Sequence, residues 1–84
     1  MAATVKDYTD DVSEIKYGDT GPYMLAIRDL INKAGIDIYN KYSYEDINTY
    51  DEGVEQCVIE FQKKNKLKET GIIDDITLNA LINQ

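Results

Sequence analysis

Hydrophobic residues recur at helical spacing in three separate stretches of the chain. In the first stretch they stand three, four and three residues apart, which places them on one face of a helix: Met24, Ile27, Ile31 and Ala34. Pro22 suits the first position of such a helix, and Gly35 suits the position just after its end. We therefore expect a helix over residues 22–34.

A second apolar face recurs at the same spacing further along the chain, on Val54, Cys57, Val58 and Phe61. Asp51 precedes this face as an N-cap, and the acidic side chains of the first turn suit the positive end of the helix dipole. We expect this helix over residues 52–64.

The third helix is expected over residues 75–82, after a chain reversal that Gly71 permits. Asp74 precedes the helix and can accept hydrogen bonds from amides two and three residues further on. Ile73 and Leu78 stand at the positions of a hydrophobic staple, which fixes how the chain enters the helix.

The connection between the first two helices, residues 36–50, is long and rich in tyrosine. Ser43 and Asp46 have the spacing that can cap a single helical turn, which predicts a short helix near residues 44–48. The pattern as a whole predicts an all-α fold of three main helices, with a long loop or a short extra helix between the first and the second.

Residues 1–14 are polar and acidic, and we interpret them as an N-terminal extension or linker ahead of one domain at residues 15–84. Two alternatives stay open for Val5, Tyr8 and Val12, which either pack on the domain or stay apart from it. This segment lacks the apolar core of a secretory signal peptide, so we expect no signal peptide here.

Two ordered sets of residues resemble the peptidoglycan-binding domain of bacterial and phage cell-wall hydrolases. The later set comprises Cys57 in place of the usual Ala, then Val58, Phe61, Gln62, Leu67, Gly71, Ile72, Ile73, Asp74, Thr77 and Leu81. The earlier set comprises Gly18, Gly21, Pro22, Asn32 and Gly35, with conservative replacements at Met24, Ile27 and Ile31. Arg28 departs from the family pattern, which usually has Gln there. The resemblance covers residues 15–82.

This resemblance implies a small three-helix orthogonal bundle that binds peptidoglycan or a muropeptide without catalysis and tethers a linked partner to the wall. It also implies a place in the cell wall, outside the cell or on a phage particle. The alternative is a protein–protein assembly module of a phage tail or a wall-associated machine. Because both would use the same fold, the fold alone does not choose between them.

Composition and charge narrow the functional classes further. The chain has no histidine and one cysteine, which opposes a zinc site, an intrachain disulfide and histidine-based catalysis. Its net charge of −7 opposes nucleic-acid binding, and no apolar run approaches the roughly 20 residues that span a membrane. We expect no enzyme activity, cofactor, metal, nucleic-acid partner or membrane partner, and we expect a monomer.

Two candidate contact surfaces follow from the sequence. The first is a groove where the turns at residues 19–20 and 71–73 meet, near two helix starts, and its residues are Asp19, Thr20, Tyr23, Tyr50, Gln62, Gly71 and Asp74. Free amides at the helix starts would seat a carboxylate, and tyrosine rings would stack on sugar or peptide. The second is a contact loop formed by Tyr39, Tyr42 and Tyr44.

Structural roles compete for several of these residues. For Gln62 we favour hydrogen bonds to loop backbone near Gly18 or Gly71, and for Asp74 we favour the role of a helix cap. Cys57 lies on an apolar face, which predicts a buried small hydrophobe. A faint pseudo-symmetry relates two triplets 34 residues apart: Met24, Ile27 and Arg28, and Val58, Phe61 and Gln62.

Overall fold

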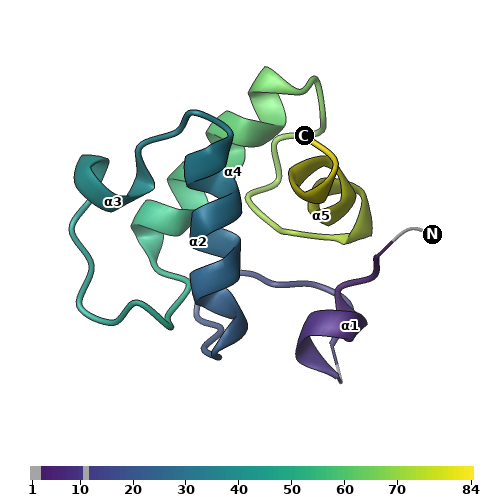
Figure 1. The fold of residues 1–84 in the computed structure, drawn as a ribbon, viewed down its shortest axis with the longest axis horizontal. Helices are drawn as coiled ribbons and strands as arrows, with labels where there is room; N and C mark the ends of the chain where they lie inside the picture. Colours follow the sequence, from purple (N-terminus) through teal and green to yellow (C-terminus); the bar gives the residue numbers. More distant parts are fainter. Residues whose placement is uncertain (1–2, 11) are drawn as a thin grey trace.

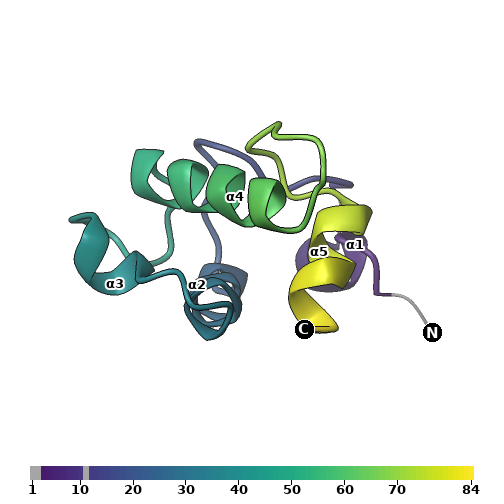
Figure 2. The ribbon, with the colours of Figure 1, turned by 90° about the horizontal axis from the view of Figure 1, so that it is seen from above.

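The computed structural model describes residues 3–10 and 12–84, and within them it shows five helices and no strand (Figure 1). The helices are α1 (Lys6–Thr9), α2 (Tyr23–Lys33), α3 (Ile38–Lys41), α4 (Glu52–Lys64) and α5 (Asp75–Ile82). The all-α fold expected from the sequence is confirmed, with α2, α4 and α5 as the main helices. Helix α2 contacts both α4 and α5, and Figure 2 shows α4 in a layer of its own above the other two.

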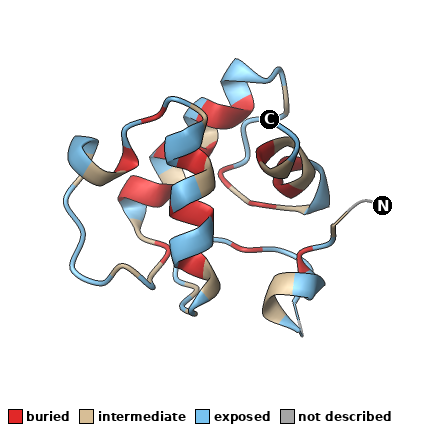
Figure 3. Cartoon of the chain, in the orientation of Figure 1, coloured by how far each residue is buried: buried red, intermediate tan, exposed pale blue. Residues whose placement is uncertain are grey.

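The apolar faces of the three main helices meet in a single core. Figure 3 shows the buried positions gathered where α2, α4 and α5 face one another. The fully or almost fully buried residues include Ile27 and Ile31 from α2, Val58 and Phe61 from α4, and Leu78 and Leu81 from α5. The three sequence stripes therefore identify the core helices, because each stripe supplies one side of this cluster.

Two aspartates start the second and third main helices as the sequence predicts. Asp51 Oδ1 accepts a hydrogen bond from the Val54 amide at 3.0 Å, and Asp74 Oδ1 accepts one from the Thr77 amide at 2.9 Å. Each cap satisfies an amide at the helix start that has no partner inside its own helix. The two caps therefore fix where the loops before α4 and α5 end.

The segment of residues 15–20, which contains a turn at residues 17–18, runs between the loops that precede α4 and α5. Ile15 and Ile73 exchange backbone hydrogen bonds of 2.9 and 2.8 Å, and Thr20 forms an isolated antiparallel bridge with Thr49. Between these bridges, the Tyr50 amide donates to the Asp19 carbonyl at 2.8 Å. The segment therefore joins two loops that the sequence places more than twenty residues apart.

The short extra helix lies at α3, and the expected helical turn at residues 44–48 is wrong. The Asp46 carboxylate accepts from the Asn48 amide at 2.9 Å and from the Thr49 hydroxyl at 3.1 Å, which holds a non-helical turn. The first main helix also begins one residue later and ends one residue earlier than expected, with Pro22 and Ala34 as its flanking residues. The bounds expected for α4 and α5 are confirmed.

Ala3 and Val5 hydrogen-bond to side chains of α5, and Figure 1 shows α1 following them on the same side of the domain. Val5 has no exposed surface, Tyr8 is half-buried, and Val12 is 37% exposed. Of the two alternatives for the segment, packing on the domain therefore holds for Val5 and Tyr8. The division of the chain between residues 14 and 15 stays a prediction. Among the described residues, no helix has the length and apolar character needed to cross a bilayer.

Candidate functional site

The seven residues of the predicted groove separate into a buried group and a surface group. Tyr50, Gln62 and Gly71 are buried, whereas Asp19 and Tyr23 are half-buried and Thr20 is exposed. Asp74 is half-buried at the start of α5, where its carboxylate serves as the cap. Only the surface group and Asp74 present side chains that a ligand could reach.

The buried group forms one chain of hydrogen bonds. The Tyr50 hydroxyl donates to the Gly71 carbonyl, and the Gly71 amide donates to Gln62 Oε1 at 2.9 Å. Burial raises the pKa of the Tyr50 phenol well above its usual value, so the hydroxyl keeps the proton that it donates. Tyr50 spans the turns near Asp19 and Gly71, because its amide donates to the Asp19 carbonyl and its hydroxyl to the Gly71 carbonyl. Its ring, however, has no exposed surface on which a ligand could stack.

Gln62 holds the loop before α5 with both ends of its amide. Its Nε2 lies 3.0 Å from the Ile72 carbonyl, 3.1 Å from Thr77 Oγ1 and 3.2 Å from Thr70 Oγ1, and its two hydrogens serve two of these oxygens at a time. The preferred structural interpretation of Gln62 is thus correct at Gly71. Gly18 instead donates its amide to the Tyr50 carbonyl at 2.9 Å.

Gly71 is the residue on which this arrangement depends. Its φ of +72° is strained for other residues, and an added Cβ would lie 3.1 Å from Glu55 Cγ and 3.3 Å from Ile59 Cγ1. Glycine therefore allows the loop to approach α4 closely enough for Gln62 to bind it.

The surface group lines a pocket of about 220 Å³, which we call the Asp19 pocket: Thr9, Val12, Asp19, Thr20 and Tyr23. The Tyr23 hydroxyl donates to the Thr20 carbonyl at 3.3 Å, and the Asp19 carboxylate accepts from the Lys16 amide at 2.9 Å. These contacts fix three of the predicted residues around one cavity. The sequence did not indicate Thr9 and Val12, because they belong to a segment interpreted as a linker.

The start of α5 is not an open seat for an anion. Asp74 caps the Thr77 amide, and Asp75 Oδ1 accepts a hydrogen bond from the Val5 amide at 2.7 Å. The carboxylate seat expected at Asp75 is therefore covered by the segment that precedes α1, and a ligand would meet two carboxylates there.

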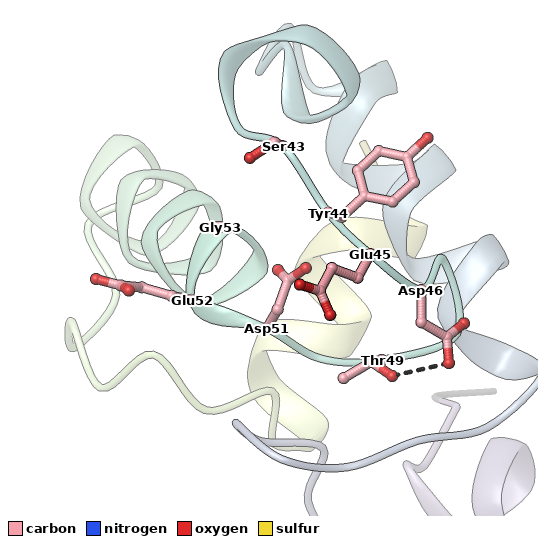
Figure 4. Close-up of a pocket in the computed structure, with 8 residues that line it drawn as sticks. All are labelled: Ser43, Tyr44, Glu45, Asp46, Thr49, Asp51, Glu52 and Gly53. Carbon is pink, nitrogen blue, oxygen red and sulfur yellow. Dashed lines mark hydrogen bonds between the residues drawn. The ribbon is translucent and has the colours of Figure 1, made fainter.

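A second pocket, of about 400 Å³, lies beside the tyrosine loop, and we call it the acidic pocket: Ser43, Tyr44, Glu45, Asp46, Thr49, Asp51, Glu52 and Gly53 (Figure 4). Four of its eight lining residues carry carboxylates. Figure 4 shows these groups spread along one loop and the first turn of α4, with the Asp46–Thr49 hydrogen bond closing the turn. The field in this pocket favours a cationic group.

The tyrosines of the predicted contact loop are partly engaged within the domain. The Tyr39 hydroxyl donates to Asp29 Oδ1, and the rings of Tyr39 and Tyr44 meet edge to face at 6.4 Å. Burial, followed by the hydrogen bond to Asp29, raises the pKa of Tyr39 to about 12. Tyr42 packs beside Gly53, where an added Cβ would lie 2.7 Å from the Tyr42 Cβ. Tyr44 is the most exposed of the three, at 38%.

Arg28 is the buried residue whose role the sequence did not predict. It is 1% exposed, and its guanidinium donates to the Ile47 carbonyl at 2.9 Å and to the Thr49 carbonyl at 2.8 Å. The same group lies 3.5 Å from Asp51 Oδ2 and 4.7 Å from the centre of the Tyr44 ring. The one sequence signal for this role is the departure from the family's Gln at position 28.

The described residues contain no group suited to metal binding. No three His, Cys, Asp or Glu side chains among them lie together as ligands. Cys57 is buried in the core, and burial, with Glu60 next, raises the pKa of its thiol to about 11, so it is a poor nucleophile near neutral pH.

Comparison with known protein families agrees with this architecture. The family model of the peptidoglycan binding domain matches residues 20–81 of the 84-residue chain. No curated protein and no solved structure gives a significant match. The match spans α2 to α5, with Gln62, Gly71 and both helix caps inside it. Because it covers well over half of the chain, the protein belongs to the peptidoglycan-binding domain family.

Proposed function

We propose that this domain binds peptidoglycan through the Asp19 pocket, catalyses no reaction on it, and holds a linked partner at the wall. The observation that supports the proposal is the family match over residues 20–81. A module that only binds raises the local concentration of whatever is joined to it, without adding chemistry of its own.

The Asp19 pocket has the mixture of groups that a sugar or a peptide stem needs. The Tyr23 ring and Val12 offer apolar surface, and the Thr9 and Thr20 hydroxyls and the Asp19 carboxylate offer polar partners. The net charge of −7 opposes long-range attraction to an anionic wall, so recognition depends on local contacts.

A pelleting assay with purified insoluble peptidoglycan tests both the ligand and the pocket. We expect the wild-type domain to sediment with the wall and Tyr23→Ala to stay largely in the supernatant. Tyr17→Ala is the matched control, because Tyr17 is 61% exposed and is not a lining residue of this pocket. Equal pelleting of both variants would place the ligand elsewhere, and a wild-type domain that stays in solution would contradict wall binding.

Titration with a soluble muropeptide locates the ligand more finely. We expect backbone amide shifts in the NMR spectrum to gather on Asp19, Thr20 and Tyr23. Shifts confined to residues 39–48 would exclude the Asp19 pocket and point to the tyrosine loop. Release of muropeptides from intact wall by this domain alone would contradict the non-catalytic part of the proposal.

The second candidate function is that of a protein–protein assembly module, which the acidic pocket favours. A smaller pocket lined by Tyr42, Ser43, Glu52, Gly53 and Gln56 continues from it, so acidic and aromatic side chains share one surface. Such a surface suits a basic segment of a partner protein. Failure to pellet, together with loss of partner binding in Tyr44→Ala, would favour this function.

A further inference from the structure

The segment before α1 contacts α5 as a bound peptide contacts a receptor. The Ala3 amide donates to Asn79 Oδ1 at 2.9 Å, and Asn79 Nδ2 donates to the Ala3 carbonyl at 2.8 Å. One side-chain amide thus satisfies both polar groups of one peptide residue, in the way a neighbouring β-strand does. This pairing recognises backbone, because the Ala3 side chain takes no part in it.

A second pair of contacts lies two residues further along the segment. The Val5 amide donates to Asp75 Oδ1 at 2.7 Å, and the Val5 side chain is fully buried in the core. Side chains of α5 therefore bind the backbone at Ala3 and Val5, and the Val5 side chain enters the core beside them.

The rest of the described segment is attached less firmly, because Ala3 and Tyr8 pack against the core while only partly buried. Helix α1 contains no buried residue, and Val5 is the only fully buried residue within residues 3–10. The polar bonds from α5 come from the side chains of Asp75 and Asn79, so the backbone hydrogen bonds of α5 do not depend on the segment. Release of residues 3–5 would leave α5 helical, with an aliphatic site and two hydrogen-bonding side chains open.

We propose that α5 carries a peptide-binding site, that residues 3–5 occupy it as a ligand within the same molecule, and that the same segment of a second copy can replace them. The attached segment has a high effective concentration, so it dominates in dilute solution. Exchange between copies then appears only at high protein concentration, as in other domain-swapped pairs. This site uses other residues than the Asp19 pocket, although Thr9 and Val12 of that pocket follow in the same segment. The proposal does not depend on the ligand of that pocket.

The test uses the full chain carrying Val5→Asp, which places a charge in the aliphatic site and releases the segment. We expect the side-chain amide signals of Asn79 to shift in the NMR spectrum of this variant. An acetylated wild-type peptide of residues 3–10, added at millimolar concentration, should return them towards their original positions. The same peptide with Val5→Asp is the matched ligand control, and Lys6→Asp is the matched protein control, because Lys6 is exposed. Unchanged Asn79 signals after addition of the wild-type peptide would overturn the proposal.

A second variant decides the matter if Val5→Asp does not fold. In Asn79→Ala, we expect the Val5 amide to exchange with solvent about tenfold faster or more, while the amides of α4 keep their wild-type rates. Equal acceleration in α4 would mean that the segment opens only when the whole domain unfolds, and would overturn the proposal. Sedimentation of wild-type protein at millimolar concentration should reveal a dimer fraction that Val5→Asp lacks, and its absence would contradict the exchange between copies.

Discussion

Arg28 and Gln62 occupy corresponding places on the buried faces of α2 and α4, yet they hold their loops by different chemistry. Gln62 uses a neutral amide that donates to oxygens and accepts from the Gly71 amide. Arg28 uses a charged guanidinium that can only donate, so it takes two backbone carbonyls and lies near the Asp51 carboxylate. We call these side chains and their contacts the Gln62 anchor and the Arg28 anchor.

The difference follows the lengths of the two connections. Gln62 binds groups that are 8 to 15 residues further along the chain, whereas the two carbonyls bound by Arg28 are 19 and 21 residues further on. The longer connection carries α3 and presents a turn whose carbonyls point inward, and arginine has the length and the donors to meet them. The long connection and the arginine that holds it are therefore one structural feature.

The largest expected loss of stability comes from shortening the buried apolar residue next to each anchor. Phe61→Ala should cost roughly 3–5 kcal/mol of unfolding free energy, because it empties a ring-sized volume beside Gln62. Ile27→Ala, beside Arg28, should cost somewhat less because it removes a smaller side chain. Urea unfolding followed by circular dichroism measures both, and Ile76→Ala, at an exposed position, serves as the control. A Phe61→Ala midpoint close to that of wild type would refute this account of the core.

Removal of the Arg28 anchor should have the next largest effect. Arg28→Ala should cost roughly 2–4 kcal/mol, because two loop carbonyls and Asp51 lose a charged donor. Arg28→Gln restores the family's usual residue but should recover little of this loss, since its amide is too short to reach both carbonyls. Thermal unfolding of the two variants compares them directly. If Arg28→Gln were as stable as wild type, loop length would not explain the arginine.

The Gln62 anchor should show a pH dependence that the Arg28 variants lack. Gln62→Glu should cost about 1–3 kcal/mol at neutral pH, because a buried carboxylate cannot donate to the Ile72 carbonyl or to Thr77. Burial raises the pKa of the introduced carboxyl above its unfolded value, so its protonated form favours folding at low pH and this benefit is lost as pH rises through the folded pKa. Unfolding curves of the variant and of wild type at several acidic pH values should therefore converge. A difference that stays constant with pH would contradict this expectation.

The smallest effect on stability is expected at Tyr39, which lies in α3 on the connection that the Arg28 anchor holds. Because its pKa is raised from 10.0 to about 12, its stabilising contribution is complete below pH 10 and is lost as pH rises through about 12. Tyr39→Phe should therefore lose less thermal stability than wild type between these two pH values. Melting temperatures of both proteins across this range provide the measurement, and parallel curves would mean that Tyr39 titrates alike in the folded and unfolded states.

The features that the sequence predicted well depend on neighbours a few residues away. The caps at Asp51 and Asp74, the reversal at Gly71 and the three apolar stripes follow from local geometry, and Gln62 reaches a loop that begins eight residues further on. The features that it missed depend on distant partners. Arg28 meets carbonyls beyond an irregular connection, Tyr50 donates to a turn 21 residues away, and Ala3 meets a side chain 76 residues away. No local pattern identifies such partners.

The candidate site was only partly predictable for the same reason, since some of its residues are distant in sequence. Asp19, Thr20 and Tyr23 share a pocket because they are close in sequence and lie at a helix start. Thr9 and Val12 form the other wall of that pocket, because the N-terminal segment docks on the domain. The spacing of hydrophobic residues in the sequence does not predict this docking.

The docking of residues 3–5 on α5 also determines how the domain responds to mechanical load. A pull applied from the N-terminal side reaches the Ala3–Asn79 pair and then Val5 before it reaches the Ile15–Ile73 bridge at the edge of the core. The weaker attachment yields first and releases the chain from Ala3 to Ile15, up to roughly 40 Å of slack. A single-molecule stretching trace should show this short early extension, followed at higher force by rupture of the helical core.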